Sequence, residues 1–200
     1  MNQLSPRTML RALVRAVRDG YANIRVLKYR LLSFSKFAGT PPNREQPVLL
    51  HNSGYVYFGQ NVIFGYRRSP GFWSSYAFID CRSEGAKVIF GNNIHVNNGF
   101  SLICEGTSIN IGDNCLIGHD VTILDSDFHA IDPEARLRNE MPRQKPVEIG
   151  HNVFIGSKSI ILKGSVIGKN SIIGAGAIVS GTFPENSLIG GNPAVLIRGL

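Results

Sequence analysis

Apolar residues recur at every sixth position along the stretch from Val147 to Ser180. Four of the six repeated positions are followed by glycine, and the repeated residues are Ile149, Ile155, Ile161, Ile167, Ile173 and Val179. A period of six fits neither an α-helix, with about 3.6 residues per turn, nor a single half-buried strand, with about two. It is typical of a solenoid in which side chains stack from one coil to the next.

The repeat is interrupted once by a long insertion. The same phase occurs earlier in the chain, at Ile111, Ile117 and Ile123. The next repeated position, Ile149, comes 26 residues after Ile123, which is not a multiple of six. The intervening polar segment, residues 125–146, contains three prolines and His129. Because a structureless insertion of this length in a compact repeat is usually functional, we expect this loop to carry chemistry.

The pattern divides the chain into three parts. Weaker repeat signals at residues 55–65 and 90–102 extend the solenoid toward the N-terminus, and an irregular loop follows the first of them at residues 66–76. We therefore expect a solenoid domain over residues 45–181, with the loop 125–146 extruded from it. Residues 1–44 form an N-terminal arm that ends in a Pro-rich linker, and residues 182–200 form a C-terminal extension.

The N-terminal arm has the pattern of an amphipathic helix over residues 6–37. Apolar residues recur there at spacings of three and four, and basic residues surround the apolar stripe. Asp19 and Gly20 are expected to break the segment into two helices. The pattern fits two arrangements: a helix packed on the end of the solenoid, or a basic amphipathic helix attracted to an anionic membrane surface.

Composition and charge narrow the classes of function. The chain has 200 residues, 43% of them hydrophobic, and a net charge of +7. Residues 1–44 hold nine basic residues and one acidic residue, whereas residues 45–200 hold twelve basic and thirteen acidic residues. Because the main body has almost no net charge, nucleic-acid binding by it is not expected. No apolar run approaches the roughly 20 residues of a membrane span, and arginines interrupt the N-terminal apolar stretches. We expect a cytoplasmic protein, at most at the inner face of a membrane.

Several segments together resemble the hexapeptide-repeat O-acetyltransferases. These segments are the repeat block itself, the loop motif DFHAID and the tail GGNPAVLIRG. The galactoside, maltose and xenobiotic acetyltransferases belong to this group, and the basic N-terminal arm is most similar to O-acetyltransferases of lipopolysaccharide O-antigen and capsule synthesis. The resemblance implies a mainly β fold, a left-handed parallel β-helix. It also implies homotrimers with active sites between subunits, acetyl-CoA as donor and a sugar or lipid-linked glycan as acceptor.

The resemblance assigns roles to individual positions. It places the catalytic histidine in the extruded loop, at His129, and the Ser157 backbone amide at the thioester carbonyl. Phe154 stands where the family often has Trp, and it keeps an apolar wall. Gly181 stands where the family often has Lys, so one contact to a CoA phosphate is either missing or made by another lysine. The positions expected to bind acetyl-CoA are Phe154, Ser157, Ala175, Ala177, Ser180 and Arg198.

The residue chemistry fits acetyl transfer to a hydroxyl. A sugar hydroxyl needs a base to remove its proton, and histidine, with a pKa near 6.5, is the natural candidate. Asp125, Asp127 and Asp132 lie close to His129 in sequence, and we expect Asp132 to orient it. We expect Asn97, Asn98 and His119 to hold the acceptor.

Other functions remain compatible with the pattern. The acceptor could be a small sugar or an antibiotic, and an amino group could be acetylated in place of a hydroxyl. A zinc hydratase would need His95, His119 and His129 to converge, but the family that it would resemble has a histidine where this chain has Leu124. No metal is therefore expected. A non-catalytic solenoid is the last alternative.

Overall fold

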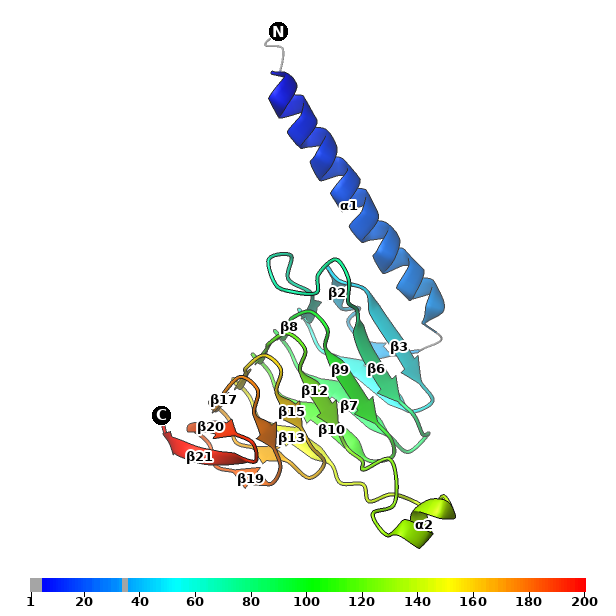
Figure 1. Ribbon diagram of the computed structural model, residues 1–200, viewed down its shortest axis with the longest axis vertical. Helices are drawn as coiled ribbons and strands as arrows, with labels where there is room; N and C mark the ends of the chain where they lie inside the picture. Colours follow the sequence, from blue (N-terminus) through cyan, green and yellow to red (C-terminus); the bar gives the residue numbers. More distant parts are fainter. Residues whose placement is uncertain (1–4, 34–35) are drawn as a thin grey trace.

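A computed structural model, which describes residues 5–33 and 36–200, is a three-sided parallel β-helix with one long helix at its N-terminal end (Figure 1). Each coil of the chain contributes one short strand to each of three sheets, which we call A, B and C. Strands that neighbour one another in a sheet therefore come from successive coils. This arrangement confirms the solenoid predicted from the six-residue period.

The strands of each sheet follow the order of the chain. Sheet A contains β1 (Ala38–Gly39), β4 (Tyr55–Phe58), β7 (Lys87–Phe90), β10 (Ser108–Ile111), β13 (Val147–Ile149), β16 (Val166–Ile167) and β19 (Thr182–Phe183). Sheet B contains β2 (Asn43–Arg44), β5 (Ile63–Phe64), β8 (His95–Val96), β11 (Leu116–Ile117), β14 (Phe154–Ile155), β17 (Ile172–Ile173), β20 (Ser187–Gly191) and β21 (Ala194–Gly199). Sheet C contains β3 (Val48–Asn52), β6 (Ala77–Cys81), β9 (Ser101–Cys104), β12 (Thr122–Leu124), β15 (Ile160–Ile161) and β18 (Ile178–Val179). The pairing is parallel throughout these strands, except that β21 runs antiparallel to β20.

The core of the β-helix is a set of stacked columns of inward side chains. In the early coils these side chains are aromatic, and the rings of Phe58 and Phe90 stack with their centroids 5.0 Å apart. In the later coils the β-branched residues Ile111 and Ile149 continue the same column and are buried. Since a parallel register places equivalent residues one above another, a six-residue repeat builds a continuous core.

Asparagines hold the turns between sheets A and B. Asn152 and Asn170 adopt φ angles of 57° and 60°, a left-handed conformation that asparagine tolerates better than most residues. Their side-chain amides form a ladder that continues to Asn186, with donor–acceptor distances of 3.0 Å. The ladder ties successive turns together along the edge of the β-helix.

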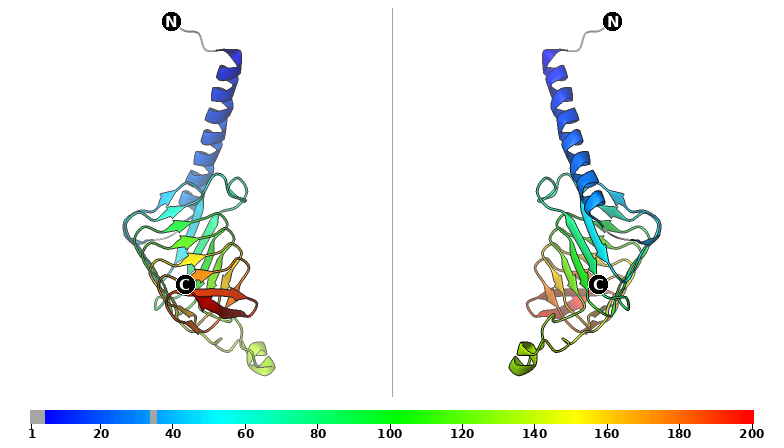
Figure 2. Two further views of the ribbon diagram at one scale, coloured as in Figure 1. Left: turned by 90° about the vertical axis from the view of Figure 1, so that its left-hand side faces the viewer. Right: turned by 90° about the vertical axis from the view of Figure 1, so that its right-hand side faces the viewer.

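The N-terminal helix α1 (Pro6–Leu32) is continuous, so the expected break at Asp19 and Gly20 is wrong. An interior glycine costs a helix about 1 kcal/mol but does not by itself end it. The helix begins at the cap residue Ser5 and ends five residues short of the expected bound, and residues 34–35 of that expected segment lie outside the described residues. Ala22 is its one buried residue, and its N-terminal half projects beyond the β-helix (Figure 2). None of the described helices is long and apolar enough to cross a membrane.

The sheets extend beyond the limits expected for the solenoid domain. Within the Pro-rich linker, β1 pairs with β4 and β2 pairs with β5, so the first coil already begins there. At the other end, β19 and β20 continue sheets A and B into the C-terminal extension. The extruded loop contains one short helix, α2 (Pro133–Leu137).

The core also contains a cysteine whose ionisation is coupled to folding. Cys115 is fully buried at a small inward position between β10 and β11. Burial raises the pKa of its thiol to about 11 from its ordinary value of 9.0, because the thiolate would lose its hydration there. As the pH rises above 9, the Cys115 thiol therefore ionises in the unfolded chain before it does so in the folded protein. Its deprotonation thus favours unfolding.

We predict that the free energy of unfolding falls by about 2–3 kcal/mol between pH 9 and pH 11 through Cys115 alone. Urea denaturation of the wild type and of Cys115→Ala across this range measures it, and the variant should lack this part of the decline. Cys81→Ala serves as the control, because it keeps Cys115. Identical pH profiles for wild type and Cys115→Ala would contradict the prediction.

Candidate functional site

A groove of about 400 Å³ lies on the outer face of sheet B. It crosses four successive coils, and it is lined by Gly65, Tyr66, His95, Val96, Asn97, Leu116, Ile117, Gly118, Phe154 and Ser157. Three of the residues singled out from the sequence meet here: Asn97, Phe154 and Ser157. The groove is therefore the candidate site.

The floor of the groove follows from the register of sheet B. His95 pairs with Leu116 and Leu116 pairs with Phe154, so their outward side chains form one row. The next residue of each strand, Val96, Ile117 or Ile155, points into the core. Leu116 and Phe154 remain 50% and 45% exposed, which leaves an apolar floor open to a ligand. The sequence interpretation considered His95 only as a zinc ligand in an alternative function and gave it no role in acetyl transfer. A step of nine residues between Leu102 and Ile111 breaks the period between His95 and Leu116.

Ser157 forms one polar wall at the edge between sheets B and C. Its hydroxyl accepts a hydrogen bond of 3.2 Å from the His119 backbone amide, one coil earlier. Among the described residues, no acceptor takes the hydrogen of the Ser157 backbone amide. A Cβ on Gly118 would lie 2.5 Å from the Ser157 nitrogen, so this close approach of two coils requires glycine. The His119 side chain is 20% exposed and lies at the same edge.

Asn97 and Asn98, predicted as a pair, have different surroundings. Asn97 lines the groove, whereas the side chain of Asn98 is fully buried. The Asn98 amide donates to the carbonyls of Tyr66, Ser69 and Pro70 at 2.9–3.1 Å, and its oxygen accepts from the Tyr66 amide at 3.0 Å. The expectation that Asn98 contacts the acceptor is therefore wrong. Asn98 holds the start of the loop 66–76, which brings Tyr66 to the groove.

The remaining residues expected at the donor site lie at three different places. Ala175 is exposed in the turn after β17, at the same edge as Ser157, whereas the side chain of Ala177 is fully buried and cannot line a groove. Ser180 is exposed in the turn between sheets C and A. Arg198 is exposed on β21, opposite Leu188. Of these residues, only Ala175 is therefore exposed at the same edge as Ser157.

The extruded loop begins at a buried carboxylate. Asp125 is fully buried, and its two oxygens accept hydrogen bonds from the backbone amides of Glu105, Gly106 and Thr107 at 2.6–3.1 Å. The loop returns beside itself, because the Lys145 amide donates to the Asp125 carbonyl at 2.9 Å. Asp125 therefore closes the base of the loop, and both of its oxygens are occupied.

His129 is exposed in this loop, and the nearby carboxylates of Asp127 and Asp132 each bind another group through one oxygen. Within residues 5–33 and 36–200, its imidazole makes no hydrogen bond. Asp132 caps α2 by accepting from the Ala135 amide at 2.8 Å, so the group expected to orient His129 is held by a helix terminus. Asp127 pairs with Lys163 at 2.6 Å through one oxygen. Its other oxygen is buried and has no partner in the described chain.

The groove and the extruded loop lie on opposite sides of one β-helix. The groove is on sheet B. The loop leaves sheet C after β12 and returns to sheet A at β13 (Figure 1). The corner between sheets C and A faces away from sheet B in a three-sided prism. One copy of the chain therefore does not bring His129 to Phe154 and Ser157.

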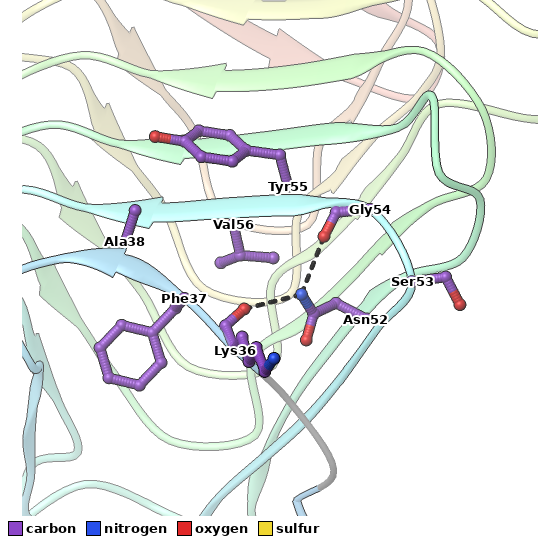
Figure 3. A pocket seen from close by; sticks show the side chains of 8 residues that line it. All are labelled: Lys36, Phe37, Ala38, Asn52, Ser53, Gly54, Tyr55 and Val56. Carbon is purple, nitrogen blue, oxygen red and sulfur yellow. Dashed lines mark hydrogen bonds between the residues drawn. The ribbon is translucent and has the colours of Figure 1, made fainter.

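A second hollow, of about 680 Å³, lies at the N-terminal end of the β-helix (Figure 3). It is lined by residues 36–38 and 52–56, and the Asn52 amide crosses it to donate to the Lys36 carbonyl at 2.8 Å. None of the residues predicted from the sequence lines it. In the described segments, no group of three or more His, Cys, Asp or Glu side chains is placed to hold a metal ion.

Comparisons with known proteins agree on the repeat. Residues 146–181 match the family described as bacterial transferase hexapeptide (six repeats), and residues 108–123 match the hexapeptide repeat of succinyl-transferase. The galactoside O-acetyltransferase of Escherichia coli K12 is 40% identical over 116 residues, which are 58% of this chain and 56% of that protein. A putative lipopolysaccharide biosynthesis O-acetyl transferase of the same organism is 28% identical over 98% of this chain and 92% of its own length.

A solved structure has the same architecture over most of the chain. The acetyltransferase specific for polysialic acid superposes with a TM-score of 0.58 and 25% identity, over 82% of this chain and 75% of that one. The shared fold is the left-handed parallel β-helix. The chain spans between 38% and 60% of the lengths of the first four curated relatives that it matches.

We predict that Asn98→Ala speeds tryptic cleavage at Arg67 and Arg68 by about tenfold or more. Loss of four buried hydrogen bonds to the loop 66–76 lowers the free energy of opening it, and tenfold corresponds to about 1.4 kcal/mol. Limited proteolysis followed by mass spectrometry measures the rate. Asn97→Ala is the matched control, since Asn97 makes none of the four bonds. Equal cleavage rates in the two variants would contradict the role of Asn98.

Proposed function

The chain belongs to the hexapeptide-repeat O-acetyltransferase family, and we propose that it transfers the acetyl group of acetyl-CoA to a sugar hydroxyl. The observation that carries the proposal is the groove on sheet B. There an apolar floor, a backbone amide that has no acceptor among the described residues and a half-buried asparagine meet across successive coils.

The groove residues have the properties that an acyl-CoA thioester needs. Leu116 and Phe154 would pack on the pantetheine arm, since both are apolar and half exposed. The Ser157 amide would donate to the thioester oxygen, where negative charge develops in the transition state. Ala175 would border the arm beyond Ser157, and Arg198 would face the phosphates. Ser180 would contact the donor from another copy, because it lies at a different corner of the β-helix.

His129 would act as the general base in a direct transfer. It takes the proton of the attacking hydroxyl, whose oxygen forms a bond to the carbonyl carbon while the carbon–sulfur bond breaks. The sulfur leaves as CoA thiolate and can receive the same proton. Because Asp132 caps α2, Asp127 is the better candidate to accept the Nδ1–H of the imidazole. Its second oxygen is buried and free to do so within the described chain.

The active site is completed by a neighbouring copy in a homotrimer. His129 lies at the corner of sheets C and A, and the groove lies on sheet B, so a second copy must supply one of them. A closed ring of three copies gives each groove one loop, because the same contact repeats around the axis. Asn97 and His119 would then hold the acceptor between the two subunits.

We infer that the acceptor is a surface polysaccharide or its lipid-linked precursor. The support is the match over nearly the whole chain to a putative lipopolysaccharide biosynthesis O-acetyl transferase. Such an enzyme would work in the cytoplasm, at the inner face of the membrane. The higher identity to a galactoside O-acetyltransferase supports a small free sugar as the alternative. A turnover screen with acetyl-CoA against free sugars, nucleotide sugars and lipid-linked oligosaccharides separates the two.

We predict that His129→Ala lowers kcat by about 100-fold or more, because general-base catalysis contributes roughly that factor. The dissociation constant of acetyl-CoA should hardly change. Steady-state kinetics and calorimetry measure the two quantities. His151→Ala is the control, since the His151 side chain is 66% exposed on a turn remote from the loop. Normal turnover in His129→Ala would rule out its role as base.

The inter-subunit site predicts complementation between two inactive variants. His129→Ala lacks the base and Phe154→Glu blocks the groove, so neither is active alone. In trimers refolded from an equal mixture, about a quarter of the sites combine an intact loop with an intact groove. Activity should recover to about that fraction of the wild type. No recovery, with mixed trimers verified by native mass spectrometry, would show that loop and groove of one copy work together.

A further inference from the structure

The helix α1 packs on the β-helix with one face only. The Arg25 guanidinium donates to the carbonyls of Phe72 and Ser75 at 2.7 and 2.5 Å, and the Tyr29 ring lies 4.7 Å from that of Tyr76. Ala22, the buried residue of α1, belongs to the same face, because positions 22, 25 and 29 are three and four residues apart. The face that docks is thus built from a small residue, an arginine and a tyrosine.

A different face of α1 carries an uncovered apolar stripe. Its residues are between 54% and 72% exposed, and they are Leu10, Leu13, Val17, Ile24, Leu27 and Leu31. The spacings of three, four and seven keep them on one side of the helix over about 30 Å. Figure 2 shows the N-terminal half of α1 projecting clear of the β-helix. A continuous apolar stripe of this length normally marks a surface that binds something.

Positive charge is concentrated on the same helix. The helix carries seven basic residues and one acidic residue, Asp19, which is paired with Arg67 at 2.5 Å. Arg7, Arg11, Arg15 and Arg18 are all exposed. From residue 45 onward the chain is nearly neutral, with twelve basic and thirteen acidic residues. The excess positive charge is therefore concentrated on the element that exposes the apolar stripe.

We propose that α1 binds the surface of an anionic lipid bilayer. Its apolar stripe enters the boundary between headgroups and acyl chains, and the positive charge of its arginines attracts the helix to the anionic surface. The face with Ala22, Arg25 and Tyr29 stays on the protein, so the helix binds lipid without leaving the β-helix. This division of labour between two faces is what the sequence pattern alone left open.

A second copy of the chain fits the stripe less well. The apolar spacing also resembles a coiled-coil seam, and three parallel helices could meet in a trimer. Such a bundle would bring three strongly basic helices side by side. Asp19 is the single acidic residue of α1, and it pairs with Arg67 of the β-helix, so it is not free to neutralise a neighbouring helix. The charge therefore favours an anionic partner over another copy.

The loop 66–76 connects the lipid-binding helix to the groove. Its middle packs on α1, with the Arg18 guanidinium 5.0 Å from the Trp73 ring centre and Arg67 paired with Asp19. Its first residue, Tyr66, lines the groove. A bilayer bound to α1 would thus hold the groove close to acceptors carried on lipid. This consequence rests on the proposed acetyl transfer, whereas lipid binding itself does not.

Co-sedimentation of the full-length protein with vesicles tests the proposal. We expect binding to phosphatidylcholine vesicles that contain about 30% phosphatidylglycerol, and little binding to phosphatidylcholine alone. Raising sodium chloride from about 50 mM to about 500 mM should weaken binding, because salt screens the arginines. The double variant Leu13→Asp/Val17→Asp should reduce the bound fraction by about tenfold.

A matched variant distinguishes loss of the apolar stripe from the effect of the added negative charge. Thr8→Asp/Ala12→Asp adds the same two negative charges at exposed positions of α1 outside the stripe, and it should retain most of the binding. Equal loss in both variants, or equal binding to both vesicle types, would overturn the proposal. So would a stripe variant that changes the oligomeric mass in light scattering and leaves lipid binding intact. Turnover of a soluble acceptor by the stripe variant reports separately on the proposed acetyl transfer.

Discussion

The structure depends on the parallel register between successive coils. Each inward side chain lies directly above its counterpart one coil away, so the core is a set of columns along one axis. A six-residue step keeps that alignment from one sheet to the next, and any longer step needs an insertion that lies outside the columns. Departures from the period are therefore confined to the edges of the prism, where loops can leave and return without disturbing the columns. The two long loops of this chain, residues 66–76 and 125–146, lie at such edges.

Buried polar side chains fix both loops. Asp125 binds three backbone amides at the base of one loop, and Asn98 binds three carbonyls and an amide at the base of the other. Each is fully buried with its hydrogen-bonding atoms satisfied, so its removal would leave several backbone groups without partners. The chemistry that we propose is thus presented by loops whose bases are as firmly held as the core. His129 itself remains exposed, as a group that must meet a substrate at a subunit boundary needs to be.

The same division applies to the N-terminal arm. Its docked face uses hydrogen bonds from Arg25 and an aromatic contact from Tyr29, and its apolar stripe is left for another surface. The loop 66–76 contacts the helix through Arg67 and Trp73 and reaches the groove through Tyr66. The proposed lipid-binding element and the proposed acetyl-transfer site are therefore joined by one loop anchored at Asn98.

The sequence by itself determined the repeating core and the position of its interruption. Ile149 through Val179 recur with a period that one architecture explains, and Ile123 and Ile149 bracket a loop that breaks it. Only the tertiary structure decided which residues from different coils lie side by side. His95 joined the groove because register aligns it with Leu116 and Phe154, which are distant in sequence. Asn98 proved to be structural, because neighbouring backbone groups occupy its side-chain polar atoms. One oxygen of Asp132 caps the helix α2. A periodic pattern encodes which side faces the core, whereas the partners of a polar side chain depend on contacts between coils that no local pattern contains.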